Sequence, residues 1–319
     1  MKPLFSLVIP VFQNELNLDN TVFECIQFFK TIEQDFSYEV IFVNDGSLDK
    51  SYEVLKKYQY QYPEIIKLIN FTKNFGQRMS TTAGIEYAKG DVVGVISADL
   101  QDPIELLAKM LDDWKNGHKL VIGHRVKRSD GFLNDLFSSA FYSLIQKFAI
   151  KNFPKGGFDF WIMDRVVVNE FLLLKQKNGN LMMTVFSLGY TYSTHDYVRK
   201  TRLAGKSGYS FWKKVESFYD AFFANSYTPI RMVSGVGVTI SIAGFLYAFY
   251  ILCSWFFATG ETYVQGWTSI AILVTIFSGF ILASLGVIGE YLWRIYDEVR
   301  KTPYYVIDEI IDNSKEGYK

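Results

Sequence analysis

Two long uncharged stretches near the carboxyl end constrain the fold of this chain more than any other feature. Residues 232–260 and 262–289 contain 29 and 28 residues without Asp, Glu, Lys or Arg, and only Glu261 separates them. A helix of about 20 apolar residues is long enough to cross a bilayer. Buried core helices rarely run so far without a charge, so two transmembrane helices are predicted between residues 231 and 290.

Positive charges flank this apolar pair on its outer sides. The loop between the two stretches has no Lys or Arg, whereas both flanking segments carry several. The positive-inside rule therefore places the large N-terminal part and the C-terminal tail in the cytoplasm. No signal peptide is expected, because Met1-Lys2-Pro3 leads directly into an apolar run. The flanking charges are Lys213, Lys214 and Arg231 before the pair, and Arg294, Arg300 and Lys301 after it.

The first hundred residues alternate between short apolar runs and segments with helical spacing of apolar residues. This alternation predicts an α/β fold, with a mostly parallel sheet covered by helices on both faces. Lys plus Arg and Asp plus Glu both total 33, so net charge gives no reason to expect nucleic acid as a partner. The expected strands are 5–10, 38–43, 65–70 and 91–96, and the expected helices are 17–31, 48–60, 77–88 and 104–111.

An acidic turn, residues 97–103, follows the fourth expected strand. In open α/β folds, ligands bind at the carboxyl edge of the sheet, where this turn lies. Asp99 is well placed to hold a divalent cation against a diphosphate, because such cations prefer oxygen ligands. Asp102 has a simpler explanation: with Pro103 and Glu105 it matches the N-cap, first position and third position of a helix.

Other loops are expected at the same edge. Asp45, in the turn after the second strand, could contact a nucleotide or simply form a turn. The basic residues of loop 73–78 could contact phosphate or simply be solvated. Cys25 and Cys253 have no spacing typical of a disulfide framework or a zinc site.

Four of these segments occur in the order found in a known enzyme family: Ile9-Pro10-Val11-Phe12, Val43-Asn44-Asp45-Gly46-Ser47, Asn74-Phe75-Gly76 and Ala98-Asp99-Leu100-Gln101-Asp102-Pro103. They resemble the motifs of glycosyltransferase family 2 enzymes with a GT-A fold, a Rossmann-like architecture. The chain is most similar to the polyprenyl-phosphate members, which include the Gtr-type bactoprenol glucosyltransferases and the dolichyl-phosphate mannose synthases. Residues 289–305 resemble the segment after the last span of the Gtr-type group.

The resemblance implies a nucleotide-sugar donor, a Mg²⁺ or Mn²⁺ cofactor and a polyprenyl-phosphate acceptor. It also assigns roles to residues. Pro10, Phe12 and Asp45 match nucleotide-contacting positions, Asp99 and Gln101 match the metal and diphosphate site, Arg125 matches a donor-side arginine, and Asp159 matches the catalytic Asp. Asp159 would act either as a base or by orienting the acceptor phosphate through an arginine.

The chain also departs from the family pattern. Many relatives have an acid at the positions of Ser97, Asn14 and Asn44, and Trp161 stands where arginine is frequent. Ser97 leaves one clear acidic metal ligand in the turn.

Three further segments point to a lipid acceptor or a membrane surface. Residues 132–150 form an apolar-faced helix that would be either core or membrane-bound. Residues 211–223 set aromatic residues opposite lysines, as in a helix lying in the headgroup region, with a core helix as the alternative. A Gly- and Ser-rich loop resembles the family's acceptor-side loop and is expected to bind phosphate, because Arg matches phosphate oxygens; its basic residues are Arg199, Lys200, Arg202 and Lys206.

The expected organisation has four parts: a GT-A domain (residues 1–205), an interfacial region (206–230), two transmembrane helices (231–290) and a cytoplasmic tail (291–319). The expected activity is inverting transfer of one sugar, glucose from UDP-glucose, to undecaprenyl phosphate at the bacterial inner membrane. The product would then pass to a flippase and a second transferase that modify a surface polysaccharide such as O-antigen.

Alternatives to this activity remain. They are transfer of mannose or an N-acetylhexosamine, a nonenzymatic nucleotide-sugar sensor, and a processive polysaccharide synthase, although the Gln-x-x-Arg-Trp motif of the last class is not found. A homo-oligomer is also possible.

Overall fold

The computed structural model describes residues 2–125, 154, 158–174, 181–198, 228–257, 266–300 and 302–312, and the statements below concern these residues. The chain forms two compact units. The first combines Met1–Ala221 with Pro303–Lys319, so it contains both ends of the chain, and the second is Phe222–Thr302. The helices expected at 132–150 and 211–223 lie outside the described residues.

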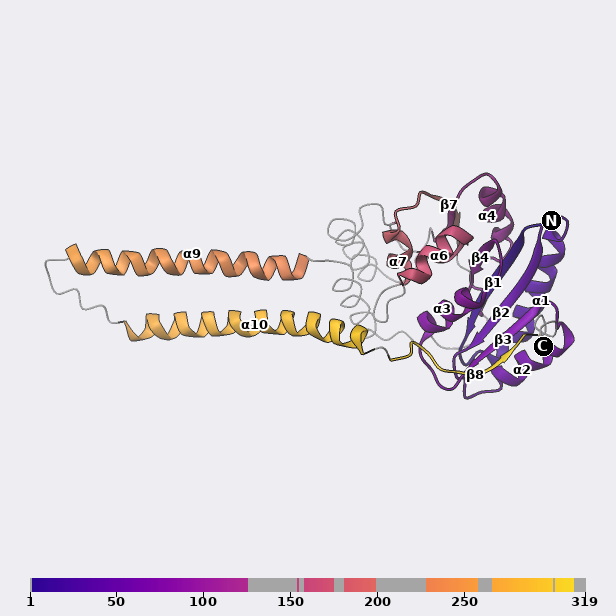
Figure 1. Cartoon of the computed structure of the whole chain (residues 1–319), viewed down its shortest axis with the longest axis horizontal. Helices are drawn as coiled ribbons and strands as arrows, with labels where there is room; N and C mark the ends of the chain where they lie inside the picture. The colour runs from indigo at the N-terminus through magenta and orange to yellow at the C-terminus, as the bar shows by residue number, and fades with distance from the viewer. Residues whose placement is uncertain are drawn as a thin grey trace. The chain divides into compact units, whose positions relative to one another are not determined.

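The first unit is built on an eight-stranded sheet with the order β7-β5-β6-β4-β1-β2-β3-β8 (Figure 1). Strands β6 and β8 run antiparallel to their neighbours, and the other neighbouring pairs are parallel. The strands are β1 (Leu4–Val11), β2 (Ser37–Asn44), β3 (Ile66–Phe71), β4 (Val92–Val95), β5 (Leu120–Arg125), β6 (Phe158–Asp164), β7 (Tyr192–Tyr197) and β8 (Ile307–Ile311).

Helices cover both faces of this sheet, as the sequence predicts. One apolar cluster joins the sheet to α1 (Glu15–Ile32), α2 (Ser51–Gln61) and α4 (Leu106–Lys115). A second cluster, on the other face, joins it to α3 (Gln77–Tyr87), α6 (Arg165–Leu173) and α7 (Leu181–Ser187). The expected mostly parallel α/β sheet is therefore confirmed.

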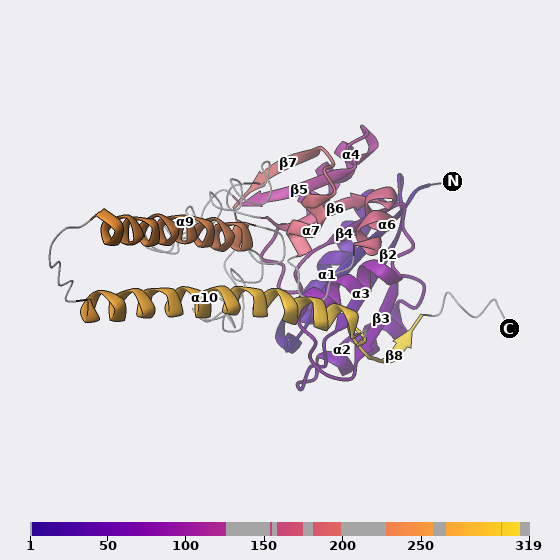
Figure 2. The ribbon, with the colours of Figure 1, turned by 60° about the vertical axis from the view of Figure 1, so that its left-hand side comes forward.

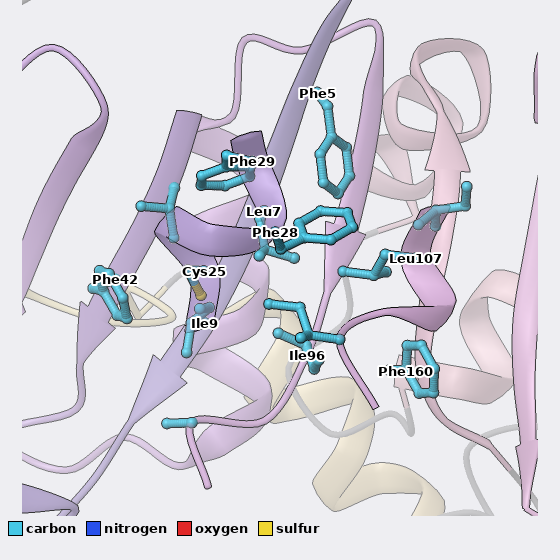
Figure 3. Close-up of a cluster of buried hydrophobic side chains, with 14 of the residues drawn as sticks. Phe5, Leu7, Ile9, Cys25, Phe28, Phe29, Phe42, Ile96, Leu107 and Phe160 are labelled. Atoms are coloured by element: carbon cyan, nitrogen blue, oxygen red, sulfur yellow. The ribbon is translucent and has the colours of Figure 1, made fainter. Parts of the chain in front are cut away.

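Period-two alternation along β1 explains the two clusters, because successive side chains of a strand point to opposite faces. Phe5, Leu7 and Ile9 belong to the first cluster and Val8 to the second. Figure 3 shows the first cluster, where the rings of Phe5 and Phe28 meet edge to face with centroids 6.4 Å apart.

Strand β8 lies within residues 291–319, for which the sequence predicts only a tail. It pairs antiparallel with β3, and Figures 1 and 2 both show it at the edge of the sheet. Several side chains fix it there. The ring of Tyr305 stacks on Phe71 with centroids 4.9 Å apart, and the Asp312 carboxylate lies 3.6 Å from the Lys67 ammonium group.

The second unit is a pair of helices, α9 (Thr228–Phe257) and α10 (Trp267–Val299), which lie side by side in Figures 1 and 2. Their segments Ile230–Tyr247 and Ile276–Asp297 are long and apolar enough to cross a membrane. No residue of either segment is buried inside the structure. The two apolar helices predicted from the sequence are therefore present. The helices approach closely at Gly237, where an added Cβ would lie 3.3 Å from the Phe280 ring.

Candidate active site

One edge of the sheet gathers the predicted site residues. This is the carboxyl end of the parallel strands, which is also where the antiparallel strand β6 begins. Phe12 follows β1, Asp45 follows β2, Asp99 follows β4, Arg125 ends β5 and Asp159 is the second residue of β6. Open α/β sheets bind their ligands at this edge, because loops from several strands meet there.

Asp45 holds two loops of this edge together. Its carboxylate oxygens accept the backbone N–H groups of Phe75 (2.7 Å) and Gly76 (2.9 Å), at the start of α3. Burial raises the pKa of Asp45 above its ordinary value, while these hydrogen bonds and one from Ser80 oppose the rise. Gly46 fits beneath the same loop, since an added Cβ would lie 2.3 Å from the carbonyl carbon of Lys73. Asp45 thus has a loop-fixing role that the sequence did not predict, and nucleotide contact stays a prediction.

A series of side-chain hydrogen bonds, which begins at the residue before Asp45, links three strands. The side-chain nitrogen of Asn44 donates to the Asn70 oxygen (2.7 Å), and the Asn70 nitrogen donates to Asp308 (3.2 Å). An acid at position 44 could not make the first of these bonds, because a carboxylate only accepts. Asn44 therefore connects β2 through β3 to the C-terminal strand.

The loop after β1 is hydrogen-bonded to the loop after β2 and to the start of α2. The backbone N–H groups of Gln13 and Asn14 donate to the hydroxyls of Ser47 (3.0 Å) and Ser51 (2.9 Å). Gln13 has a left-handed φ of 48°, an uncommon conformation for a residue with a side chain.

Pro10 and Phe12, both predicted to contact the nucleotide, differ in exposure. Pro10 is buried inside the strand, whereas Phe12 is 43 % exposed at the edge. Phe12 is therefore accessible at this edge, and its contact with a nucleotide stays a prediction.

The acidic turn is a compact, hydrogen-bonded unit. The Asp99 oxygen Oδ1 accepts the hydroxyl of Ser97 (2.8 Å) and lies 3.3 Å from the backbone nitrogen of Gln101. Leu100, between them, has a left-handed φ of 44°, and such strain is concentrated at functional sites. The Thr21 hydroxyl of α1 donates to the Ala98 carbonyl (2.6 Å), which anchors the turn to the domain.

The N-cap role predicted for Asp102 stays a prediction. Helix α4 begins at Leu106, and residues 103–105 form a tighter turn between Asp102 and this helix. Asp102 is fully buried, with its two oxygens near the hydroxyls of Tyr197 (2.6 Å) and Ser97 (3.1 Å). Sequence reasoning missed Tyr197, because nothing local connects two residues 95 positions apart.

Strands β5 and β6 carry the remaining predicted residues. Phe160 pairs with Gly123 and Phe158 with His124, so Asp159 is the extra residue of a bulge. Bulges often lie next to active sites, where they redirect a side chain. Arg125 is half-buried at the end of β5. The Asp159 side chain lies outside the described residues, as do Arg202 and Lys206 entirely.

The half-buried side chains of Asp99 and Gln101 offer oxygen donors, the type that Mg²⁺ and Mn²⁺ prefer. Among the residues that the structure describes, no group of three or more His, Cys, Asp and Glu side chains could hold a metal ion. A cation here would use few protein ligands, as is usual where substrate phosphates complete the shell.

Comparison with known proteins shows the family to which the chain belongs. Residues 6–172 match the glycosyl transferase family 2 profile. The chain is 36 % identical over 306 residues to a glycosyltransferase of Bacillus subtilis, YkcC, covering 96 % of this chain and 93 % of that one. It is 32 % identical over 310 residues to the bactoprenol glucosyl transferase of Shigella phage SfII, covering 95 % and 96 % of the two chains.

The fold has a solved counterpart. A Pyrobaculum calidifontis mannosyltransferase superposes with a TM-score of 0.50 and 15 % identity, covering 93 % of this chain and 88 % of that one. This likeness supports the GT-A fold. Because the family profile covers more than half of the chain, and the relatives match almost its whole length, the chain belongs to glycosyl transferase family 2 and is a glycosyltransferase.

Proposed function

We propose that this glycosyltransferase moves glucose from UDP-glucose to undecaprenyl phosphate, with inversion at the anomeric carbon. The similarity to bactoprenol glucosyl transferases carries this proposal, because it extends over 95 % of the chain and therefore includes both apolar helices. Bactoprenol is a polyprenyl lipid, so an acceptor of this kind explains why a transferase domain is joined to membrane-spanning helices.

The donor binds at the carboxyl edge of the sheet in this proposal. Phe12 and the Asp45 turn contact the nucleotide, Arg125 lies on the donor side, and Asp99 with Gln101 holds a Mg²⁺ or Mn²⁺ ion. When bound, such an ion neutralises charge on the departing diphosphate. The Pyrobaculum mannosyltransferase was solved with GDP-Man and Mn²⁺, which supports a nucleotide-sugar and metal site in this fold.

The acceptor side is formed by Asp159 and the basic loop. Arg202 and Lys206 bind the acceptor phosphate, because guanidinium and ammonium groups donate to phosphate oxygens. Asp159 takes the residual proton of that phosphate as it attacks the sugar.

The enzyme acts at the bacterial inner membrane, with its catalytic unit in the cytoplasm. Residues 206–230 lie along the inner leaflet, and α9 and α10 span the bilayer. The lipid-linked glucose then requires a flippase and a second transferase to reach a surface polysaccharide such as O-antigen.

A donor panel tests this function. Membranes with the full chain are incubated with radiolabelled UDP-glucose, GDP-mannose or UDP-N-acetylglucosamine together with undecaprenyl phosphate, and the lipid extract is counted. Label from UDP-glucose alone is the expected result. Label from another donor would correct the sugar, and no lipid label from any donor would favour a nucleotide-sugar sensor.

A further inference from the structure

We propose that Asp102, Ser97 and Tyr197 form a relay that positions the Asp99 carboxylate for its divalent cation. This inference rests on the proposed role of Asp99 as a metal ligand. Asp102 and Tyr197 are positioning residues here, since neither touches the ion.

The relay runs from the end of the edge strand β7 to the acidic turn. The Tyr197 hydroxyl donates to Asp102 Oδ1 at 2.6 Å. Ser97 Oγ lies 3.1 Å from the other oxygen of Asp102 and 2.8 Å from Asp99 Oδ1. Tyr197 ends β7, so this path joins the strand before the basic loop to the predicted metal ligand.

Burial shows that Asp102 is not an ordinary surface acid. Its side chain is 0 % exposed, and Tyr197 is 6 % exposed. A buried carboxylate costs free energy unless hydrogen bonds compensate it, and here two hydroxyls lie within bonding distance.

Ser97 has a single hydroxyl hydrogen, so it donates to one carboxylate at a time. Its oxygen lies 2.8 Å from Asp99 and 3.1 Å from Asp102, so the hydroxyl exchanges between the two carboxylates and holds them in register. Ser97 therefore acts as a donor that orients the Asp99 carboxylate.

The metal affinity of a Tyr197→Phe variant distinguishes this relay from direct ligation of the ion by Ser97. If Ser97 bound the ion itself, loss of the Tyr197 hydroxyl would leave metal affinity unchanged. If the relay operates, Tyr197→Phe lets Asp102 shift and disorders the Ser97–Asp99 contact. Outer-shell partners of metal ligands typically change affinity by about 10-fold or more when removed.

The experiment measures Mn²⁺ binding to the full-length protein in detergent micelles, with and without excess UDP, from the electron paramagnetic resonance signal of unbound Mn²⁺. We expect affinity to fall about 10-fold in Ser97→Ala and about 3-fold or more in Tyr197→Phe. Ser97→Thr, which keeps the hydroxyl, should stay within about 2-fold of the parent.

Two controls remove the same groups elsewhere in this unit. Ser193→Ala deletes a hydroxyl that donates to Asp113, and Tyr58→Phe deletes one that donates to Asp19 at 2.8 Å. Both should bind Mn²⁺ like the parent. Melting temperatures of all variants without metal identify any general loss of folding.

The outcomes separate this inference from the proposed function. If Asp99→Asn binds Mn²⁺ as tightly as the parent, the metal site itself is misplaced. If Asp99→Asn loses binding but Tyr197→Phe does not, the site stands and the relay is wrong. A Ser97→Thr variant as weak as Ser97→Ala would equally overturn the relay.

Discussion

Gln59 is a buried amide in the core of the first unit. It lies on α2 with 0 % exposure, and within the described part of the chain neither its oxygen nor its nitrogen has a hydrogen-bond partner. An unpaired buried amide typically costs about 1–3 kcal/mol.

Replacing Gln59 with Leu should therefore stabilise the protein by about 1 kcal/mol, because an apolar side chain of similar size has no polar group to desolvate. The measurement is the melting temperature of the full chain in detergent. The exposed Gln27→Leu on α1 is the matched control and should change it little. A lower melting temperature for Gln59→Leu would show that the amide is satisfied in solution.

The pH dependence of an Asp159→Asn variant tests whether Asp159 is the base of the reaction. A phosphate acceptor has a second pKa of about 6, so it is largely deprotonated at neutral pH. If Asp159 removes the residual proton, Asp159→Asn should lose most activity near pH 6 and recover part of it by pH 8. The check is the variant-to-parent activity ratio across that range, and a flat ratio would indicate that Asp159 orients the phosphate instead.

Strand β8 is the element that joins the C-terminal segment to the catalytic sheet. It covers the β3 edge. Just after it, Asp312 joins a buried ion pair in which Lys67 Nζ and Glu39 Oε2 lie 2.5 Å apart. An uncovered edge strand exposes unpaired N–H and C=O groups and invites aggregation.

Ending the chain after Thr302 should therefore lower the melting temperature and promote aggregation, even though both apolar helices remain. The milder Asp312→Asn should destabilise the domain by roughly 1–3 kcal/mol, because it leaves the buried Lys67 charge less compensated. Ending the chain after Asp312 is the control and should behave like the parent. An unchanged melting temperature in the 302 truncation would show that β8 adds nothing to the fold.

Elements differ in how far the sequence predicts them. Strands β1 to β4 are buried on both faces, so they read as continuous apolar runs. Strand β8, Ile307-Asp308-Glu309-Ile310-Ile311, is short, carries two acids and follows a long membrane-type helix, so no local pattern assigns it to the sheet. Strand β7 is largely polar, Tyr192-Ser193-Thr194-His195-Asp196-Tyr197, and escapes prediction for the same reason.

Site residues show the same limit. Motif order predicts Asp99 and Asp45 at one sheet edge, and the structure places them there. The sequence pattern around Asp102 is local and indicates only helix capping, whereas its partner Tyr197 comes from a distant strand. Pairings over 95 positions depend on the sheet order, which spacing alone does not supply.

At the scale of the whole molecule, the chain leaves one folded unit and returns to it. Residues before the apolar helices and residues 307–311 share a single sheet. A sheet cannot be divided by a bilayer, so α9 and α10 either both cross the membrane or both fail to cross it. This constraint is independent of the positive-inside rule and agrees with its prediction.

Reporter fusions test this topology. A fusion at Ser314 should report the cytoplasm, and one at Gln265, between the two helices, should report the opposite side. A cytoplasmic signal at Gln265 would contradict two spans. A signal from opposite sides of the membrane for the N-terminus and Ser314 would contradict the shared sheet.

The most direct test of the proposed reaction is transfer by the purified full-length enzyme in nanodiscs, supplied with UDP-[¹⁴C]glucose, undecaprenyl phosphate and Mn²⁺. We expect labelled lipid whose glucose is attached with inverted anomeric configuration. Asp99→Asn or a chelator should remove nearly all of this product, because the cation is lost. Label that stays entirely in the aqueous phase, or transfer that Asp99→Asn leaves intact, would contradict the proposed reaction.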